Sequence, residues 1–361
     1  MVTSLRAAAA LLFLMLLCAR AVRADPDVPD SRDRAAVGRT RDRGESRLDT
    51  GPAPEAAAEA CDRRCLQDLA DTYVRALLAH DAGQLPLAEG ARFTETGQEL
   101  ALGDGFWRTV SGGGGFRLYV PDVQAGEVGL LGTLKEFDTP VLMALRLKVV
   151  NRRISEVETL FHRRGSGPAW ADAGVAQLDA HGADALWTAP IPPAARATGE
   201  ALIAAAAAYL GGMEHYNARV SYPLAPDCVR LQDGARVTHN PGIVIGGHGF
   251  NLATLGCLEQ LRSGWFASIT GMHHRRIIAD PDYGLALAWV NIDQAGTKAV
   301  VADGRTVPTP ALAQPLGTEA VYAFRIENGL IRRIESLTTP VPYHMGPGWD
   351  EGAPPTAAAG R

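Results

Sequence analysis

Gly-Phe-Trp-Arg (105–108), followed by Phe-Arg-Leu-Tyr-Val-Pro-Asp (116–122), recurs in altered form as Ser-Gly-Trp-Phe (263–266) and His-Arg-Arg-Ile-Ile-Ala-Asp (274–280). A constant spacing between similar stretches is typical of an internal repeat. Four residues of the first copy recur as the same residue type 158 positions later, for example Trp107 as Trp265. They are Trp107, Arg117, Asp122 and Gly126. We therefore expect two copies of one domain.

The elements around these stretches follow the same order in both copies. In the first copy, residues 66–80 carry apolar side chains at helical spacing, and strand-like stretches follow at 116–121, 127–135, 141–150 and 154–162. A helix followed by consecutive antiparallel strands predicts an α+β domain. We expect a strongly curved antiparallel sheet to wrap around the helix as a cone with one open mouth, and the two cones to pair within the chain.

The chain ends predict export and little structure. Arg6 followed by the apolar run 7–17 and by Val-Arg-Ala (22–24) is typical of a cleaved signal peptide. Residues 25–59 have almost no large apolar side chains, which predicts a disordered tether. The expected segments are a signal peptide (1–24), a tether (25–60), a first domain (61–165), a linker (166–196), a second domain (197–345) and a C-terminal tail (346–361).

Four cysteines remain after the signal peptide, and an even number in an exported chain predicts disulfides. Three pairings are possible. Cys61 and Cys65 are close enough for a local bond, which would leave Cys228 to pair with Cys257. A single Cys-x3-Cys is a weak metal motif, so we expect no metal.

Composition excludes several partners. The net charge is −5, and there is no basic patch with interleaved aromatic residues, so nucleic acid is not an expected partner. No second apolar run could cross a membrane, so none is expected after cleavage of the signal. The sequence predicts a secreted or periplasmic protein.

The sequence resembles the SnoaL-like, or nuclear-transport-factor-2-like, superfamily, and more closely a family of exported tandem SnoaL-like proteins common in fungi. The motifs that carry the resemblance are residues 79–95, 92–100, 103–107, 146–149, 227–230 and 342–349. The resemblance implies tandem cone-shaped domains that work without a cofactor, using Asp, Glu, His, Tyr or Arg around an apolar pocket. Members include isomerases, cyclases, hydrolases and binding modules, and some exported relatives are thought to cleave lignin-type aryl ethers.

Polar residues at core positions are the candidate catalytic groups. His274 and Arg276 replace apolar Phe116 and Leu118 on one strand face of the second copy, although the opposite face could point inward instead. His215 follows a helix, and Arg230 lies on a strand with a cysteine. We predict His215 or His274 as the proton-transfer group and Arg230 or Arg276 as the stabiliser of a developing anion. Surface patches and salt bridges are the alternatives for these residues.

Substrate contacts are expected from other residues of the second copy. Trp289, Asn291 and Asp293 alternate onto one strand face, where they could form an aromatic floor with two polar groups. Two loops could cover the cavity, at 246–250 and 294–317. The predicted binding residues are Tyr216, His248, Trp289, Asn291 and Asp293.

These features predict a cofactor-independent enzyme that performs acid–base chemistry on a small aromatic molecule. Hydrolytic cleavage of a lignin-derived β-aryl ether is the specific version, which the family resemblance implies. The alternatives are a SnoaL-type isomerase or cyclase, and a non-catalytic module that binds a hydrophobic ligand.

Overall fold

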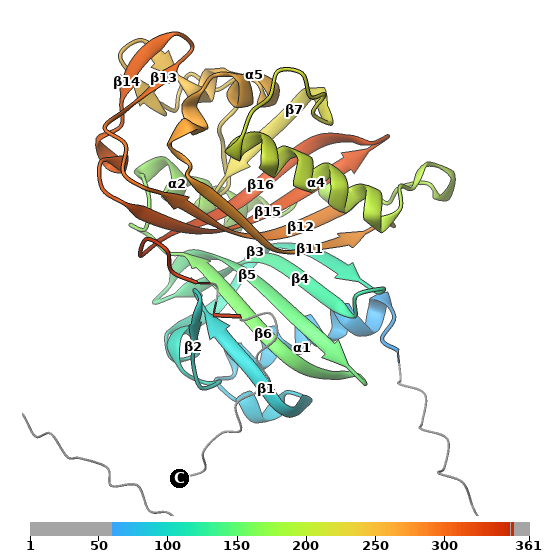
Figure 1. The fold of residues 1–361 in the computed structure, drawn as a ribbon. Helices are drawn as coiled ribbons and strands as arrows, with labels where there is room; N and C mark the ends of the chain where they lie inside the picture. The colour runs from blue at the N-terminus through green and yellow to red at the C-terminus, as the bar shows by residue number, and fades with distance from the viewer. Residues whose placement is uncertain (1–59, 347, 350–361) are drawn as a thin grey trace, which may run out of the picture. The chain divides into compact units, whose positions relative to one another are not determined.

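The first helix, α1 (Arg63–Leu78), begins where the Asp62 side chain accepts a hydrogen bond from the Cys65 backbone N–H at 2.8 Å. Its apolar stripe, which includes Leu66 and Tyr73, is buried against one face of a six-stranded sheet (Figure 1). This computed structural model describes residues 60–346 and 348–349. The strands of this first sheet, in spatial order, are β2 (Gln98–Glu99), β1 (Leu87–Glu95), β6 (Arg153–His162), β5 (Thr139–Val150), β4 (Glu127–Glu136) and β3 (Val110–Asp122).

A second helix-and-sheet pair follows later in the chain. Helix α4 (Gly199–Glu214) begins at Thr198, whose side chain accepts a hydrogen bond from the Ala201 N–H at 3.2 Å. Its buried face includes Leu202, Tyr209 and Met213. The second sheet consists, in spatial order, of β8 (Ala235–Arg236), β7 (Leu224–Gln232), β16 (Leu330–Val341), β15 (Leu316–Glu327), β12 (Leu285–Gln294) and β11 (Gly271–Asp280).

The two sheets have corresponding strand orders and registers. Each has one parallel pair, β1 with β6 and β7 with β16, and its other neighbouring strands are antiparallel. Tyr119 pairs with Leu130 in the first sheet, and Ile277 pairs with Ala288 in the second, 158 positions later in both strands. Positions in the two sheets can therefore be compared one to one.

The two sheets pack face to face, and α1 and α4 cover their outer faces (Figure 1). The shared core is apolar. Gly129 permits close approach at its centre, because a Cβ there would lie 2.3 Å from the Leu287 side chain. Its buried side chains include Phe116, Leu118, Val120, Leu131, Leu142 and Leu160 of the first sheet and Ile278, Leu285, Leu287, Trp289, Val321 and Leu337 of the second.

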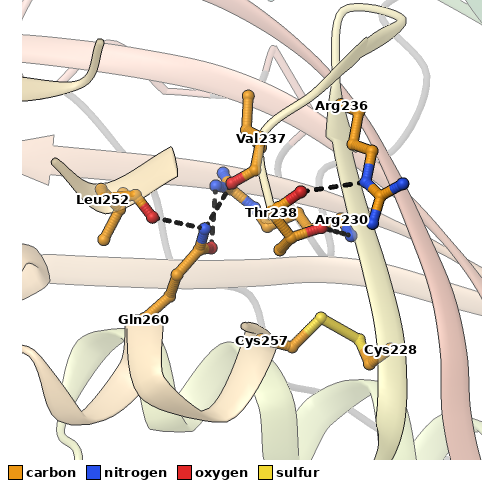
Figure 2. Close-up of a disulfide and its surroundings, with 8 residues drawn as sticks. All are labelled: Cys228, Arg230, Arg236, Val237, Thr238, Leu252, Cys257 and Gln260. Atoms are coloured by element: carbon orange, nitrogen blue, oxygen red, sulfur yellow. Dashed lines mark hydrogen bonds between the residues drawn. A yellow bond between two sulfur atoms is a disulfide. The ribbon is translucent and has the colours of Figure 1, made fainter. Parts of the chain in front are cut away.

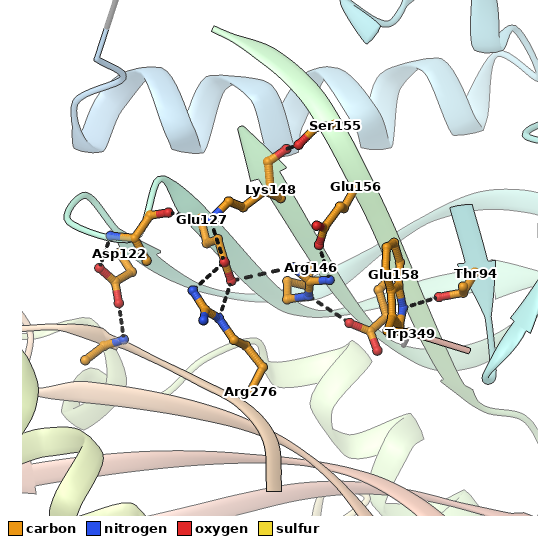
Figure 3. A network of polar contacts seen from close by, with 12 residues as sticks. Thr94, Asp122, Glu127, Arg146, Lys148, Ser155, Glu156, Glu158, Arg276 and Trp349 are labelled. Carbon is orange, nitrogen blue, oxygen red and sulfur yellow. Dashed lines mark hydrogen bonds and ion pairs between the residues drawn. The ribbon is translucent and has the colours of Figure 1, made fainter. Parts of the chain in front are cut away.

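Ionic contacts border this core, and Figure 3 shows them. Arg276 donates from Nε and Nη2 to the two carboxylate oxygens of Glu127, at 3.0 and 2.5 Å. Arg146, which is 2% exposed, is ion-paired with Glu127, Glu156 and Glu158. Burial opposes the charge of Arg146, but these carboxylates outweigh it and raise its pKa. The charges at this border are therefore mutually compensated.

The segment between the two sheets forms α2 (Ala169–His181) and α3 (Ala185–Thr188), and the second half adds α5 (Cys257–Arg262). Two small antiparallel ribbons also occur, β9 (Gly246–Gly247) with β10 (Phe250–Asn251), and β13 (Ala299–Ala302) with β14 (Arg305–Pro308). The C-terminal segment returns to the first sheet, where Trp349 Nε1 donates to the Thr94 hydroxyl at 2.9 Å (Figure 3).

The expected fold class, α+β with two tandem cone-shaped nuclear-transport-factor-2-like domains, is wrong for this chain. Strands predominate among the described residues, which form four sheets and five α-helices of 4 to 16 residues, and none of these sheets closes into a barrel. The main cause is that each large sheet buries its second face against the other sheet. In addition, two segments expected to be loops form ribbons. The turn Asp303-Gly304 has positive φ at both residues, which favours the β13–β14 hairpin.

The cysteine pairing is confirmed, with bonds Cys61–Cys65 and Cys228–Cys257. Such bonds are typical of proteins that fold in oxidising compartments. Among the helices described, none is long and apolar enough to cross a bilayer. The predicted signal peptide and most of the tether and tail lie outside the described residues.

Candidate active site

A cavity of about 510 Å³ lies on the α4 side of the second sheet. Strand β7 contributes Arg230 and Gln232 to its wall, whereas Asp227 points to the opposite, exposed side and pairs with Arg332. This division follows from the alternation of side chains along a strand. Apolar side chains form much of the remaining wall: Trp170, Met213, Ile245, Leu252, Trp265, Phe266 and Leu312.

The register explains why the second sheet has space where the first is filled. Phe93 pairs with Val157 in the first sheet, and Arg230 pairs with Ile334 at the corresponding place in the second. The same comparison adds 177 to residue numbers on β6, so Phe161 corresponds to Thr338. Phe93 and Phe161 are buried in the first core, but Arg230 and Thr338 line the cavity. Because the second sheet has no aromatic ring at these two places, a cavity remains there, and the Arg230 guanidinium lines it.

Arg230 is 3% exposed and is held by two neutral amides, of which Figure 2 shows that of Gln260. Its Nη2 donates to Gln232 Oε1 at 3.0 Å, and its Nη1 donates to Gln260 Oε1 at 3.4 Å. The Gln260 amide in turn donates to the carbonyls of Val237 and Leu252, at 2.5 and 3.0 Å. The buried Nε of Arg230 has no hydrogen-bond partner among the described residues.

The Cys228–Cys257 bond fixes this arrangement, because it joins β7 to the first residue of α5 (Figure 2). Arg230 lies two residues after Cys228 on one side of the bond, and Gln260 lies three residues after Cys257 on the other. The Cα atoms of the two cysteines are 5.9 Å apart. The disulfide therefore holds the strand that carries the cation against the helix that orients it.

Asp233 provides a carboxyl at the same wall. It lies in the turn after β7, with a positive φ of 49°. Helix α2 packs on this turn at Gly174, where a Cβ would lie 2.4 Å from the Asp233 carbonyl oxygen. The carboxylate accepts hydrogen bonds from the Thr338 N–H and hydroxyl, both at 2.9 Å. Burial raises the pKa of Asp233 to about 6, against the opposing effects of His162, Thr338 and Arg230.

His162 reaches Asp233 from the end of β6 in the first sheet. Its Nδ1 lies 3.4 Å from Asp233 Oδ1, and its Nε2 lies 3.5 Å from Asp172 Oδ1 on α2. The ring is 2% exposed and lies behind Asp233. The site therefore depends on side chains from both sheets and from the helix between them.

Two further buried acids complete the polar surroundings. Burial raises the pKa of Tyr322 to about 12, although neighbouring Arg230 opposes the rise. Burial also raises the pKa of Glu335, on β16, to about 8, and the negative charge of Asp233 adds to this effect. Tyr322 lines the cavity directly. At neutral pH the site thus combines a cation, a partly titrating carboxyl and a neutral phenol.

Of the predicted catalytic residues, Arg230 lines the cavity, whereas His215 and Arg276 lie elsewhere. The His215 side chain is 81% exposed after the last residue of α4. Arg276 is paired with Glu127 at the border between the sheets. His274 lies on β11, where its backbone pairs with Val290. A β-bulge between His274 and Arg276 interrupts the alternation on which that predicted face depended, and Ile278 faces the first sheet.

The predicted binding residues also lie outside this cavity. Tyr216 stacks on Tyr222 and accepts a hydrogen bond from Arg262, and His248 is exposed between β9 and β10. Trp289 shares the face of the sheet–sheet core. Asn291 contacts the Met345 carbonyl, and Asp293 accepts from the His344 backbone N–H at 3.1 Å. Both suggested covering loops do contribute wall residues, among them Gly246 and Pro310.

Sequence reasoning missed Asp233, Gln260, Tyr322 and His162. A partial signal for Asp233 exists, because Asp-Gly (233–234) directly follows the strand that carries Arg230. Tyr322 lies on the same face of β15 as Phe324, and the sequence alone does not show that Tyr322 reaches a cavity. As for metals, no three His, Cys, Asp or Glu side chains gather as a metal site would require within residues 60–346 and 348–349.

A family model described as a domain of unknown function (DUF8021) matches residues 195–338, which include β7, α5 and most of the cavity. No curated protein matches the sequence.

Solved structures resemble only part of the chain. An LEH-like epoxide hydrolase of M. tuberculosis is 13% identical, with a TM-score of 0.24 over 39% of this chain and 84% of its own. The epoxide hydrolase/cyclase-like enzyme SalBIII, from polyether salinomycin formation, is 10% identical, with a TM-score of 0.25 over 38% and 91%. A de novo designed protein with a curved β-sheet is 11% identical, with a TM-score of 0.25 over 39% and 87%. The resemblance is thus to part of the chain, and the fungal, exported and tandem expectations stay predictions.

Proposed function

We propose that the chain is an enzyme that performs acid–base chemistry, without a cofactor, on a small and largely apolar molecule bound in the 510 Å³ cavity. The observation that carries this proposal is the presence of Asp233, whose pKa is raised to about 6, beside the buried cation Arg230. A carboxyl that titrates near neutral pH can both accept and return a proton. A buried cation stabilises negative charge more strongly than one in water.

For hydrolysis, the roles follow from these positions. Asp233 takes a proton from water, and the oxygen of that water forms a bond to the substrate carbon as the carbon–oxygen bond of the leaving group breaks. The departing oxygen carries the electron pair and is stabilised by Arg230. It then receives the proton from Asp233, which restores the site. His162 touches Asp233 but does not line the cavity, so it is a positioning residue.

The finer proposal is that the substrate is aromatic and that the leaving group is a phenol, as in a β-aryl ether of lignin type. Trp170, Trp265 and Phe266 in the wall suit aromatic rings. A phenolate is also a leaving group that a guanidinium stabilises well. We further propose export to an oxidising compartment, which both disulfides support.

The test uses the purified full chain with guaiacylglycerol β-guaiacyl ether as the probe, with phenol release and product mass as readouts. We expect guaiacol and guaiacylglycerol, whose masses together equal the mass of the probe plus one water. Asp233→Asn should reduce the rate at least 100-fold, in the range known for loss of a general base. Asp227→Asn is the matched control, because this carboxylate lies on β7 but faces the exposed side.

Each outcome of this test distinguishes between classes of function. Conversion without change of mass would indicate an isomerase or cyclase and would refute hydrolysis. Ligand binding with no conversion of any stereoisomer would leave a hydrophobic-ligand-binding module as the function. Equal rates for Asp233→Asn and the control would remove Asp233 from the mechanism.

A further inference from the structure

The charge balance around Arg230 differs from that of the other fully buried arginines. Arg146 is paired with three glutamates, and Arg325 is paired with Glu327 at 2.7 Å. Arg230 is as well buried, yet among the described residues no carboxylate oxygen lies within the 4.0 Å of an ion pair. A buried charge is costly unless an opposite charge or hydrogen bonds compensate it.

The first sheet has a glutamate at the place where the second sheet has Gln232, the neighbour of Arg230. Glu95 pairs with Thr159 in the register, and Gln232 pairs with Ser336 at the corresponding place. Glu95 forms an ion pair with Arg163 at 3.2 Å, whereas Gln232 offers Arg230 only a neutral amide oxygen. The amide orients the guanidinium without compensating its charge.

Arg230 also keeps donor capacity that no described residue uses. A guanidinium has five N–H donors. Two of them donate to glutamines, one of these at the long distance of 3.4 Å, the Tyr322 oxygen accepts a further hydrogen bond from the guanidinium, and Nε has no partner. Asp233 shares the cavity and acts on Arg230 only through its field, beyond ion-pair distance. The cavity is otherwise walled largely by apolar and aromatic side chains.

We propose that the molecule bound in this cavity carries a permanent negative charge, a carboxylate attached to an aromatic or other apolar body, and that Arg230 binds this carboxylate. The inference rests on the cavity assigned in the proposed function, but it concerns binding alone. Gln232 and Gln260 are positioning residues that hold the guanidinium without competing for its charge. A carboxylate is the group whose geometry matches the guanidinium fork.

Isothermal titration of the full chain with 3-phenylpropanoate and with 3-phenylpropanamide tests the proposal. The two probes have the same apolar body, and only the first is charged at pH 7. Hydrogen bonds to charged groups are worth about 1.5–3 kcal/mol, so the carboxylate should bind roughly 10- to 100-fold more tightly. Equal affinity for the two probes would overturn the inference.

Gln232→Glu is the decisive variant. It keeps Arg230 and the side-chain shape but places a carboxylate on Nη2, as Glu95 does for Arg163 in the first sheet. We expect it to fold and to lose the preference for the carboxylate probe. Retention of that preference would refute the role of Arg230, as would retention in Arg230→Met. Arg236→Met, which removes an exposed cation nearby (Figure 2), should leave both affinities unchanged.

This outcome is independent of catalysis. Preferential binding of the carboxylate with no conversion of aryl ethers would support the inference and refute the proposed enzyme. Turnover of uncharged ethers with no preference for the carboxylate would support the enzyme and refute the inference.

Discussion

Replacing Glu335 by glutamine should make the protein more stable than wild type in alkaline solution. This side chain is 1% exposed, and burial is the main cause that raises its pKa to about 8. The charge of Asp233 adds to the rise, whereas the backbone N–H groups of Gly234 and Ser336 and the charge of Arg230 oppose it. Arg333 also interacts with Glu335 electrostatically.

The sign follows from proton linkage. The folded state holds the Glu335 proton up to about pH 8, but the unfolded chain releases it near the ordinary value of 4.5. Between these two values the folded state binds more protons, so stability is full below pH 4.5 and falls as pH rises towards 8. A shift of about 3.5 units corresponds to roughly 5 kcal/mol at 1.36 kcal/mol per unit. This is a large part of the 5–15 kcal/mol typical of a folded domain.

Glutamine carries no charge at any pH, and its carbonyl oxygen can still accept the Gly234 N–H, which lies 3.0 Å from Glu335 Oε1. Urea denaturation at pH 4.5, 6, 7.5 and 9 gives the free energy of unfolding of wild type and of Glu335→Gln. The two free energies should therefore depend on pH alike near pH 4.5 and diverge as the pH rises. Glu200→Gln, an exposed glutamate at the start of α4, is the matched control. If wild type and Glu335→Gln lost stability in parallel up to pH 9, the linkage argument would fail.

Three other predictions concern packing and charge. Removal of the Cys228–Cys257 bond, which spans 29 positions, should lower the free energy of unfolding by about 3–4 kcal/mol in urea titrations, and a loss below about 1 kcal/mol would contradict its constraining role. Thr338→Phe, which restores the ring found at the corresponding Phe161, should narrow the cavity beside Arg230, weaken ligand binding and cost about 1–3 kcal/mol; unchanged affinity in titration would show that the ligand binds elsewhere. Glu127→Gln should destabilise the protein by about 3 kcal/mol, because it removes a buried partner of two arginines, and a melting temperature within one degree of wild type would argue against this.

Periodicity predicted which residues share a strand face but not what that face contacts. Trp289, Asn291 and Asp293 do lie on one face of β12, as alternation required. That face meets the first sheet at Trp289 and the C-terminal segment at Asn291 and Asp293, and it does not line the cavity. A sheet–sheet core and a ligand pocket select similar apolar residues, so the pattern alone does not distinguish them. The hairpin at 299–308 could have been predicted, since Asp303-Gly304 is a strong turn signal between β-branched residues.

The candidate site was only partly accessible from sequence for a similar reason. Arg230 was found because a charged residue occupied a core position on a strand beside a cysteine. Asp233 and Gln260 come from a turn and a short helix, and their proximity depends on how α5 is attached to β7. His162 is 71 residues before Asp233 in the chain, so its contact is visible only after the two sheets have packed.

The positions of His162 and Trp170 determine where a recombinant fragment of this protein should begin. A fragment that starts after α2 would retain Arg230, Gln260 and the disulfide between Cys228 and Cys257. It would lack the imidazole behind Asp233 and one aromatic part of the cavity wall. It would also expose Trp289 and the rest of an apolar sheet face to water, which favours aggregation. Expression plasmids for binding or activity screens should therefore encode both sheets, with the intervening helix, in one open reading frame.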